Sequence, residues 1–200
     1  MNPFNRHPDM KPTAVSPLNR RQFLQRAAAG LALPLLVPGS VLGRNGVVAP
    51  SNRIVFGGIG MGHRARHILP NFLSFKAIHF AAVSDARRDR LQSAKEMVDA
   101  HYRNSDCAMH DDFRALLARP DIDAVLIATG NRWHAMASMF AAHAGKDIYC
   151  EKPISLTIQE GRNLVETCRR FGTIYQAGTQ RRSTASYRFA RDMVQQGKIG

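Results

Sequence analysis

Short apolar runs alternate with stretches of helical spacing along residues 51–200. The five residues from Ala124 to Ala128 are all apolar, which is typical of a strand buried on both faces of a sheet. Leu91, Ala94 and Val98 instead recur at the spacing of one helix face. Because strands separated by helices imply parallel βαβ units, the pattern predicts an α/β fold with a doubly wound parallel sheet.

The same pattern predicts where the elements begin and end. Strands are expected at residues 53–56, 78–83, 124–128, 147–150 and 173–177, and helices at 62–72, 87–100, 111–118, 132–144, 157–171 and 183–196. Asp111 is expected to cap the third of these helices. Thr157 and Glu160 have the spacing of a capping box at the start of the fifth helix, and Gly172 is expected to end it.

The first fifty residues form a leader that we exclude from the fold. Arg20 and Arg21 are followed by Phe23-Leu24 and then by an apolar run broken by Pro34. A basic region followed by a short apolar region is the layout of an export signal, and the paired arginines predict the twin-arginine (Tat) translocase as a partner. An ordinary amphipathic helix is the alternative. The export prediction places the protein in the periplasm, or otherwise outside the cytoplasm, with cleavage within 39–50 or a retained leader.

Composition and charge narrow the function classes. Hydrophobic residues are 44% and charged residues 22% of the chain, which excludes a wholly disordered protein. The formal net charge is +13, but residues 1–50 carry six basic residues against one acid and residues 51–200 carry 22 against 14. Because the basic residues are spread among acids, a solvated surface is favoured over nucleic-acid binding. The chain has no 18 uninterrupted apolar residues, so no stable membrane span is expected.

The three cysteines, Cys107, Cys150 and Cys168, lack C-x-x-C spacing. They are too few to build a disulfide-held mini-protein. No zinc or other metal site is expected from them.

A glycine-rich turn follows the first expected strand. Its five residues, Gly58, Ile59, Gly60, Met61 and Gly62, are expected to bind a dinucleotide cofactor. Glycines at this place permit a tight turn and let the backbone approach a pyrophosphate, whose charge meets the N-terminus of the next helix. The strict G-x-G-x-x-G pattern is not met, because His63 occupies its last place. An ordinary strand-to-helix turn is the alternative.

Asp85 follows the second expected strand, a little over twenty residues after the glycines. An acid here accepts hydrogen bonds from both ribose hydroxyls of NAD and repels the extra phosphate of NADP, so NAD is the favoured cofactor. Arg87 and Arg88 could instead shield a 2′-phosphate, which keeps NADP as an alternative. Asp85 could also serve only as the N-cap of the helix that follows.

Three further segments carry the signal of a family. They are Ala128-Thr-Gly-Asn-Arg-Trp-His134, Ala144-Gly-Lys-Asp-Ile-Tyr-Cys-Glu-Lys-Pro153 and Gln176-Ala-Gly-Thr-Gln-Arg-Arg-Ser183. Together with the glycine turn, they resemble the Gfo/Idh/MocA oxidoreductases, the group around glucose–fructose oxidoreductase and inositol dehydrogenase. The resemblance covers residues 52–200. The sequence departs from the family pattern at His63, Gly130 and Arg132, which bears on phosphate contacts more than on the assignment.

The resemblance implies a domain organisation. Residues 51–180 would form a dinucleotide-binding Rossmann domain. Residues 181–200 would begin a second α/β domain that supplies the substrate pocket, most of which would lie beyond residue 200. The parent protein would be a homo-oligomer.

The resemblance also implies roles for residues that follow the central strands. Lys152, in the Glu-Lys-Pro tripeptide, would be the catalytic residue and would lie where nicotinamide meets substrate. A lysine there can hydrogen-bond the substrate oxygen, stabilise a developing alkoxide and share in proton transfer, and burial would favour its neutral amine. Thr129, His134 and Glu151 are expected to bind the cofactor together with Lys152. Gln180 is expected to reach the active site.

Each of these roles has a simpler alternative. Lys152 could be a surface lysine paired with Glu151, and His134 could be a capping or packing residue. Three functions follow from the whole pattern. The first is hydride transfer between a sugar or polyol carbinol and NAD or NADP, in which the 200 residues alone would be inactive. The others are an NAD-dependent glycoside hydrolase of the same fold and a non-catalytic NAD-binding fragment.

Overall fold

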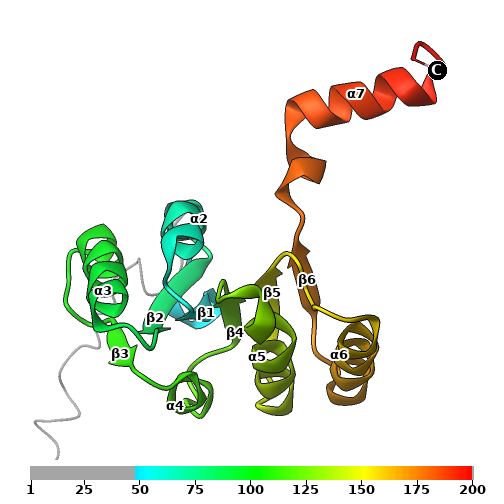
Figure 1. Ribbon diagram of the computed structural model, residues 1–200. Helices are drawn as coiled ribbons and strands as arrows, with labels where there is room; N and C mark the ends of the chain where they lie inside the picture. Colours follow the sequence, from blue (N-terminus) through cyan, green and yellow to red (C-terminus); the bar gives the residue numbers. More distant parts are fainter. Residues whose placement is uncertain (1–47, 200) are drawn as a thin grey trace, which may run out of the picture. The chain divides into compact units, whose positions relative to one another are not determined.

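Six parallel strands form one sheet in the order β3-β2-β1-β4-β5-β6, which confirms the predicted doubly wound α/β fold. Figure 1 shows the computed structural model, which describes residues 48–199. The strands are β1 (Ile54–Ile59), β2 (Ile78–Ser84), β3 (Ala108–His110), β4 (Ala124–Ile127), β5 (Asp147–Glu151) and β6 (Tyr175–Gly178). The predicted Tat signal falls within residues 1–47 and lies outside the described residues.

Helices connect the strands and cover both faces of the sheet. They are α2 (His63–Leu73), α3 (Arg88–Tyr102), α4 (Phe113–Leu117), α5 (Asn131–His143) and α6 (Ile158–Phe171). Helices α2 and α3 lie on one face, and α4, α5 and α6 lie on the other (Figure 1). Two 3-10 helices, η2 (Pro50–Asn52) and η3 (Gln180–Ser183), flank the sheet in the chain, and α7 (Ala185–Gln195) follows with no buried residue.

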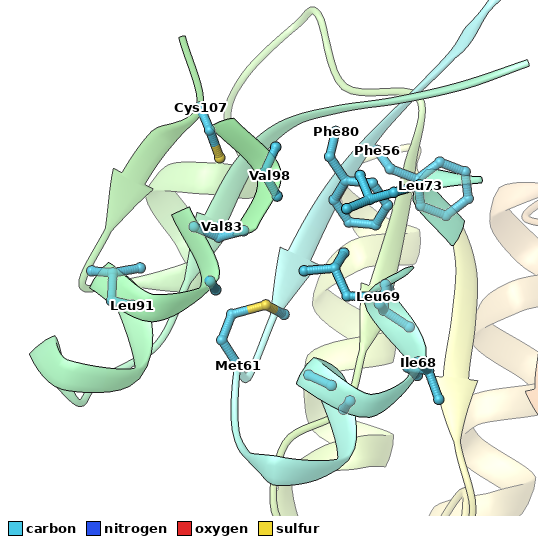
Figure 2. Packing of buried hydrophobic residues seen from close by; sticks show 14 of the residues in the cluster. Phe56, Met61, Ile68, Leu69, Leu73, Phe80, Val83, Leu91, Val98 and Cys107 are labelled. Carbon is cyan, nitrogen blue, oxygen red and sulfur yellow. The ribbon is translucent and has the colours of Figure 1, made fainter. Parts of the chain in front are cut away.

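Each face of the sheet has its own apolar core. On one face, Phe56 and Phe80 pack with ring centroids 5.5 Å apart, and Leu69 of α2 points into the same cluster (Figure 2). On the other face, Leu116 of α4 and Leu164 of α6 pack beneath the strands. Each fully buried side chain of this size contributes about 1.5–3 kcal/mol. Strand β4 lies between the two cores, which is why all four of its residues are buried.

The structure corrects the predicted end of the first strand. Strand β1 does not stop at Phe56 but continues through Gly57 and Gly58 to Ile59. A Cβ atom on Gly57 would lie 2.6 Å from a methyl carbon of Leu116. Glycine therefore allows α4 to pack closely against the middle of this strand.

Two further elements differ from the prediction. Strand β3 was not predicted, because three half-buried residues are too short to produce a period-two pattern. The predicted cap of the third helix is wrong by one residue. The N-cap of α4 is Asp112, whose carboxylate accepts a hydrogen bond from the Arg114 N–H at 2.9 Å, and not Asp111.

The predicted ends of α6 are confirmed. The Thr157 hydroxyl accepts a hydrogen bond from the Glu160 N–H at 3.1 Å, and Gly172 ends the helix with a φ of 67°. The Glu160 carboxylate differs from an ideal capping box, because it accepts from the Leu156 N–H at 2.8 Å instead of the N–H of Thr157. The sheet ends at Gly178, and the start of a second domain at residue 181 stays a prediction. Within residues 48–199, no helix has the length and apolar character needed to cross a membrane.

Candidate functional site

A hollow of about 550 Å³ opens at the carboxyl edge of the sheet. Strand β1 lies there between β2 and β4, and the helices that follow β1 and β4 pack on opposite faces. This is the topological switch point, where doubly wound sheets bind their ligands. The hollow is lined by the turn after β1, the end of β2 and the starts of α3, α4 and α5.

The turn after β1 has the shape that a dinucleotide requires, but two residues later than the sequence suggested. Gly60 has a φ of 81°, and a Cβ atom there would lie 2.6 Å from the Cα atom of Thr129. Gly62 is the N-cap of α2, and Ala65, in the first turn of this helix, is fully buried. Gly60, Gly62 and Ala65 therefore occupy the three places of a G-x-G-x-x-A fingerprint. His63 is an intervening residue of this pattern and does not break it.

The other residues of the predicted turn lie elsewhere. Gly58 and Ile59 belong to β1, and a Cβ atom on Gly58 would lie 2.7 Å from the methyl carbon of Met61. The Met61 side chain is fully buried and points into the core between β1 and α2 (Figure 2). Of the five predicted residues, three thus lie in the turn, and Met61 presents only its backbone there. The cofactor contacts of all five stay predictions.

Asp85 lies beside this turn and lines the hollow. One of its carboxylate oxygens accepts a hydrogen bond from the Met61 N–H at 2.7 Å, and the other accepts from the Arg87 N–H at 2.8 Å. The N-cap alternative is wrong, because the N-cap of α3 is Arg87, without a side-chain hydrogen bond. Asp85 ties the end of β2 to the glycine turn and keeps a carboxylate at the rim of the hollow.

The arginines near Asp85 differ in their pairing. Arg87 donates two hydrogen bonds to Asp89, at 3.0 and 2.8 Å, and Arg88 lies 3.8 Å from Asp111. Arg90 also lines the hollow, and a Cβ atom on Gly62 would lie 3.5 Å from its guanidinium nitrogen. Arg90 was not predicted. Its position in the first turn of α3, which begins at the carboxyl edge of the sheet, is the sequence feature that could have indicated it.

Thr129 and His134 are close to the hollow, but only Thr129 lines it. The Thr129 hydroxyl donates to the Gly130 carbonyl at 3.3 Å. His134 is buried, with Nδ1 2.6 Å from the Pro153 carbonyl oxygen and Nε2 3.2 Å from the Thr129 carbonyl oxygen. Both ring nitrogens thus face backbone oxygens. His134 links the loop after β4 to the loop after β5, as its packing alternative predicts, and its cofactor contact stays a prediction.

The Glu151-Lys152-Pro153 segment lies at the end of β5. The expected burial of Lys152 is not found, because its side chain is exposed. Glu151 is buried and pairs with Arg64 of α2 at 2.8 Å, so it is not the partner of the Lys152 side chain. Its second carboxylate oxygen lies 3.4 Å from the Lys152 backbone N–H. With its amide oxygen turned toward Arg64, Gln180 accepts a hydrogen bond from that guanidinium at 2.9 Å.

The cysteines of the described chain are all free and buried. Burial raises the pKa of the Cys150 thiol, and burial followed by the nearby Asp99 carboxylate raises the pKa of Cys107 to about 12. These thiols are therefore protonated at neutral pH and are poor nucleophiles. Residues 48–199 hold no group of three His, Cys, Asp or Glu side chains placed to bind a metal ion.

Residues 53–179 match the family described as "Oxidoreductase family, NAD-binding Rossmann fold". The uncharacterized oxidoreductase YrbE of Bacillus subtilis (strain 168) is 31% identical over 150 residues, which cover 75% of this chain and 42% of that protein. Glycosyl hydrolase family 109 protein 1 of Shewanella sp. (strain ANA-3) is 28% identical over 176 residues, with 76% of this chain and 37% of that protein covered.

Solved structures show the same fold. Scyllo-inositol dehydrogenase from Lactobacillus casei, with bound NAD(H) and scyllo-inositol, matches with a TM-score of 0.65 and 28% identity over 74% of this chain and 42% of that one. KijD10, a 3-ketoreductase from Actinomadura kijaniata in complex with NADP and TDP-benzene, matches with a TM-score of 0.66 and 26% identity over 74% and 44% of the two chains. This chain spans about two fifths of the length of such proteins.

Proposed function

The chain belongs to the Gfo/Idh/MocA oxidoreductase family, and from this premise we propose that it is the NAD(H)-binding part of an enzyme that oxidises or reduces a sugar or polyol. The observation that carries the proposal is the glycine turn. Gly60 lines the hollow at the switch point of the sheet, and Gly62, two residues later, is the N-cap of α2. A dinucleotide pyrophosphate fits such a turn, and the N-terminus of α2 favours its negative charge.

Asp85 supports NAD over NADP. Its carboxylate lines the hollow and is held there by two backbone N–H groups, so it is oriented before any ligand binds. Each of its oxygens keeps a lone pair for a ribose hydroxyl, and its charge opposes a 2′-phosphate. Arg87 is occupied by Asp89, which reduces its capacity to offset that charge.

The reaction that we propose uses Lys152 at the exposed end of β5. Bound NAD supplies the hydride acceptor. The Lys152 side chain would hydrogen-bond the substrate oxygen, take up the hydroxyl proton when the carbinol is oxidised and return it when the carbonyl is reduced. His134 would keep the backbone after Lys152 in place, because its Nδ1 atom lies within hydrogen-bond distance of the Pro153 carbonyl oxygen. The substrate pocket itself would come from outside these 200 residues.

A glycoside hydrolase that uses NAD transiently is a second candidate. The specific support is the 28% identity to glycosyl hydrolase family 109 protein 1, which aligns over 76% of this chain. In a longer protein that contains this chain, release of free sugar from a glycoside without net NADH formation would favour this candidate. Net NADH formation from a sugar or polyol would favour the oxidoreductase.

Titration of the 200-residue chain with NADH tests the cofactor proposal. Trp133 is the only tryptophan of the chain and lines the hollow, so energy transfer from its indole to bound NADH reports binding. We expect saturable quenching by NADH and binding of NADPH that is about tenfold weaker, or ~1.4 kcal/mol. No quenching in a sample shown to be folded by circular dichroism would contradict the proposal.

Asp85→Asn tests the origin of the preference. Asparagine keeps an oxygen for the Met61 N–H but loses the negative charge, so the gap between NADH and NADPH should shrink to about threefold or less. The matched control is Glu96→Gln, which removes a negative charge from α3 outside the hollow, leaves the pairing of Arg87 with Asp89 intact and should keep most of the gap. An unchanged gap in Asp85→Asn would assign the preference to another group.

A further inference from the structure

A partly buried ion pair joins α2, the proposed phosphate-binding helix, to the end of β5, directly before the proposed catalytic lysine. Arg64 lies in the first turn of α2, and its Nη2 atom is 2.8 Å from the Glu151 carboxylate at the end of β5. The Glu151 side chain is only 4% exposed. Because a helix N-terminus repels positive charge, an arginine at this place needs a compensating partner, and Glu151 supplies it.

The surroundings of the pair hold it in one arrangement. Gln180 of η3 accepts a second hydrogen bond from the same Arg64 nitrogen at 2.9 Å. A Cβ atom on Gly178 would lie 3.0 Å from the Glu151 carboxyl group, so this glycine makes room for the buried carboxylate. In the described chain, the Arg64 Nε atom is also buried and makes no hydrogen bond. A single guanidinium nitrogen, Nη2, therefore donates to both Glu151 and Gln180.

The ion pair connects the two elements that would face the two halves of a bound dinucleotide. Arg64 belongs to the helix whose N-terminus would face the pyrophosphate, and Glu151 directly precedes Lys152 in the chain. The second Glu151 oxygen is also within 3.4 Å of the Lys152 N–H. Because Glu151 contacts both Arg64 and the Lys152 N–H, the ion pair fixes the position of the Lys152 backbone relative to α2.

We infer that Arg64 is a positioning residue, which acts through Glu151 to hold the Lys152 segment in register with the phosphate-binding helix. The inference rests on the proposed function, since it assumes that a dinucleotide spans these two elements. In this inference Glu151 has a structural role as the partner of Arg64 and does not contact the cofactor directly. It also predicts that the pair is felt by the nicotinamide half of the dinucleotide more than by the ADP-ribose half.

Direct contact between Arg64 and the pyrophosphate is the competing explanation. In that case NADH and ADP-ribose, which share the pyrophosphate, would lose the same affinity when Arg64 is replaced. Glu151→Gln would then have a smaller effect than Arg64→Gln. Positioning through Glu151 predicts instead that the two replacements act alike and are not additive.

The experiment is a double-mutant cycle on the full chain with two ligands. Arg64→Gln, Glu151→Gln and the paired variant Arg64→Gln/Glu151→Gln are titrated with NADH and with ADP-ribose by calorimetry. The paired variant leaves no unpaired buried charge, so it stays informative if a single variant folds poorly. Arg66→Gln removes a charge from the same helix and is the matched control.

We expect each single replacement to weaken NADH binding about tenfold and ADP-ribose binding less than threefold, with the paired variant no weaker than either single one. Arg66→Gln should bind both ligands as the unchanged chain does. Equal losses for the two ligands, or additive losses in the paired variant, would overturn the inference and leave the proposed function intact. If the unchanged chain binds neither ligand, the proposed function fails first and the inference fails with it.

Discussion

Gly60 holds the backbone conformation on which the site depends. Its φ of 81° lies in the left-handed region, where an L-residue with a Cβ atom is strained by roughly 1–2 kcal/mol. Thr129 adds a second reason, because its Cα atom would lie 2.6 Å from any Cβ atom at this position. Backbone strain and steric overlap with Thr129 therefore both require glycine at position 60.

We expect Gly60→Ala to lower the free energy of unfolding by more than about 2 kcal/mol and to abolish NADH quenching of Trp133. Gly130→Ala is the matched control, since no atom lies within 4 Å of its would-be Cβ and its φ is −70°. The control should stay within about 1 kcal/mol of the unchanged chain. Urea unfolding of both variants measures the difference. Equal stabilities would show that the turn adapts to a side chain.

The sequence predicted where some of the site residues lie, but not what they contact. The position of Asp85 at the carboxyl edge of the sheet followed from its place directly after a strand, while its contact with a cofactor stays a prediction. Its bond to the Met61 N–H could not be foreseen, because it depends on how the turn closes over β2. Lys152 was the obvious neighbour for Glu151, yet the partner is Arg64, 87 residues earlier in the chain. Spacing along a sequence does not show which residues meet across parallel strands.

At the scale of elements, local capping chemistry proved reliable where it was strong. The Thr157 hydroxyl and Gly172 mark the two ends of α6 as predicted. The glycine turn was misplaced because Gly57 and Gly58 look like the end of a strand, whereas they serve close packing within it. Strand β3 was missed because it is short and lies at the edge of the sheet. Tertiary contacts decided both cases.

Thr157→Ala tests the cap of α6. The variant loses the hydrogen bond to the Glu160 N–H, and we expect the free energy of unfolding to fall by about 1 kcal/mol. Thr167→Ala in the same helix is the matched control. Its hydroxyl bonds the Asn163 carbonyl within the helix, and alanine has the higher helix propensity, so stability should be unchanged or slightly raised. Thermal unfolding compares the stabilities of the two variants with that of the unchanged chain. An equal loss of stability in Thr157→Ala and Thr167→Ala would argue against a capping role for Thr157.

The fold of the whole molecule was predictable because its signals are redundant. A fully apolar β4 indicates a strand with a core on each face, and alternating helices indicate parallel crossovers. The two cores in the structure meet both requirements. The substrate was not predictable, because the hollow at the switch point is the place of the proposed cofactor, and the chain spans about two fifths of the length of its relatives.

Stability against acid is a property of the whole molecule that two histidines should control. Burial followed by Arg53 lowers the pKa of His79, and burial followed by Arg119 lowers the pKa of His110, both from an ordinary 6.5. The unfolded chain then takes up these protons at a higher pH than the folded chain. Their contribution to the free energy of unfolding is therefore fully present above about pH 7 and is lost as the pH drops through 6.5 toward their lowered pKa values.

The carboxylates act in a separate range. Hydrogen bonds from Arg114 and Arg119 lower the pKa of Asp112 and Asp121, so their contribution is lost only as the pH falls below about 4. Urea unfolding between pH 7.5 and pH 5 thus isolates the histidines. The paired variant His79→Phe/His110→Phe keeps an aromatic ring at each position and removes the titrating nitrogens. We expect its free energy of unfolding to depend less on pH across this range than that of the unchanged chain. The same slope in both proteins would mean that other groups cause the acid sensitivity.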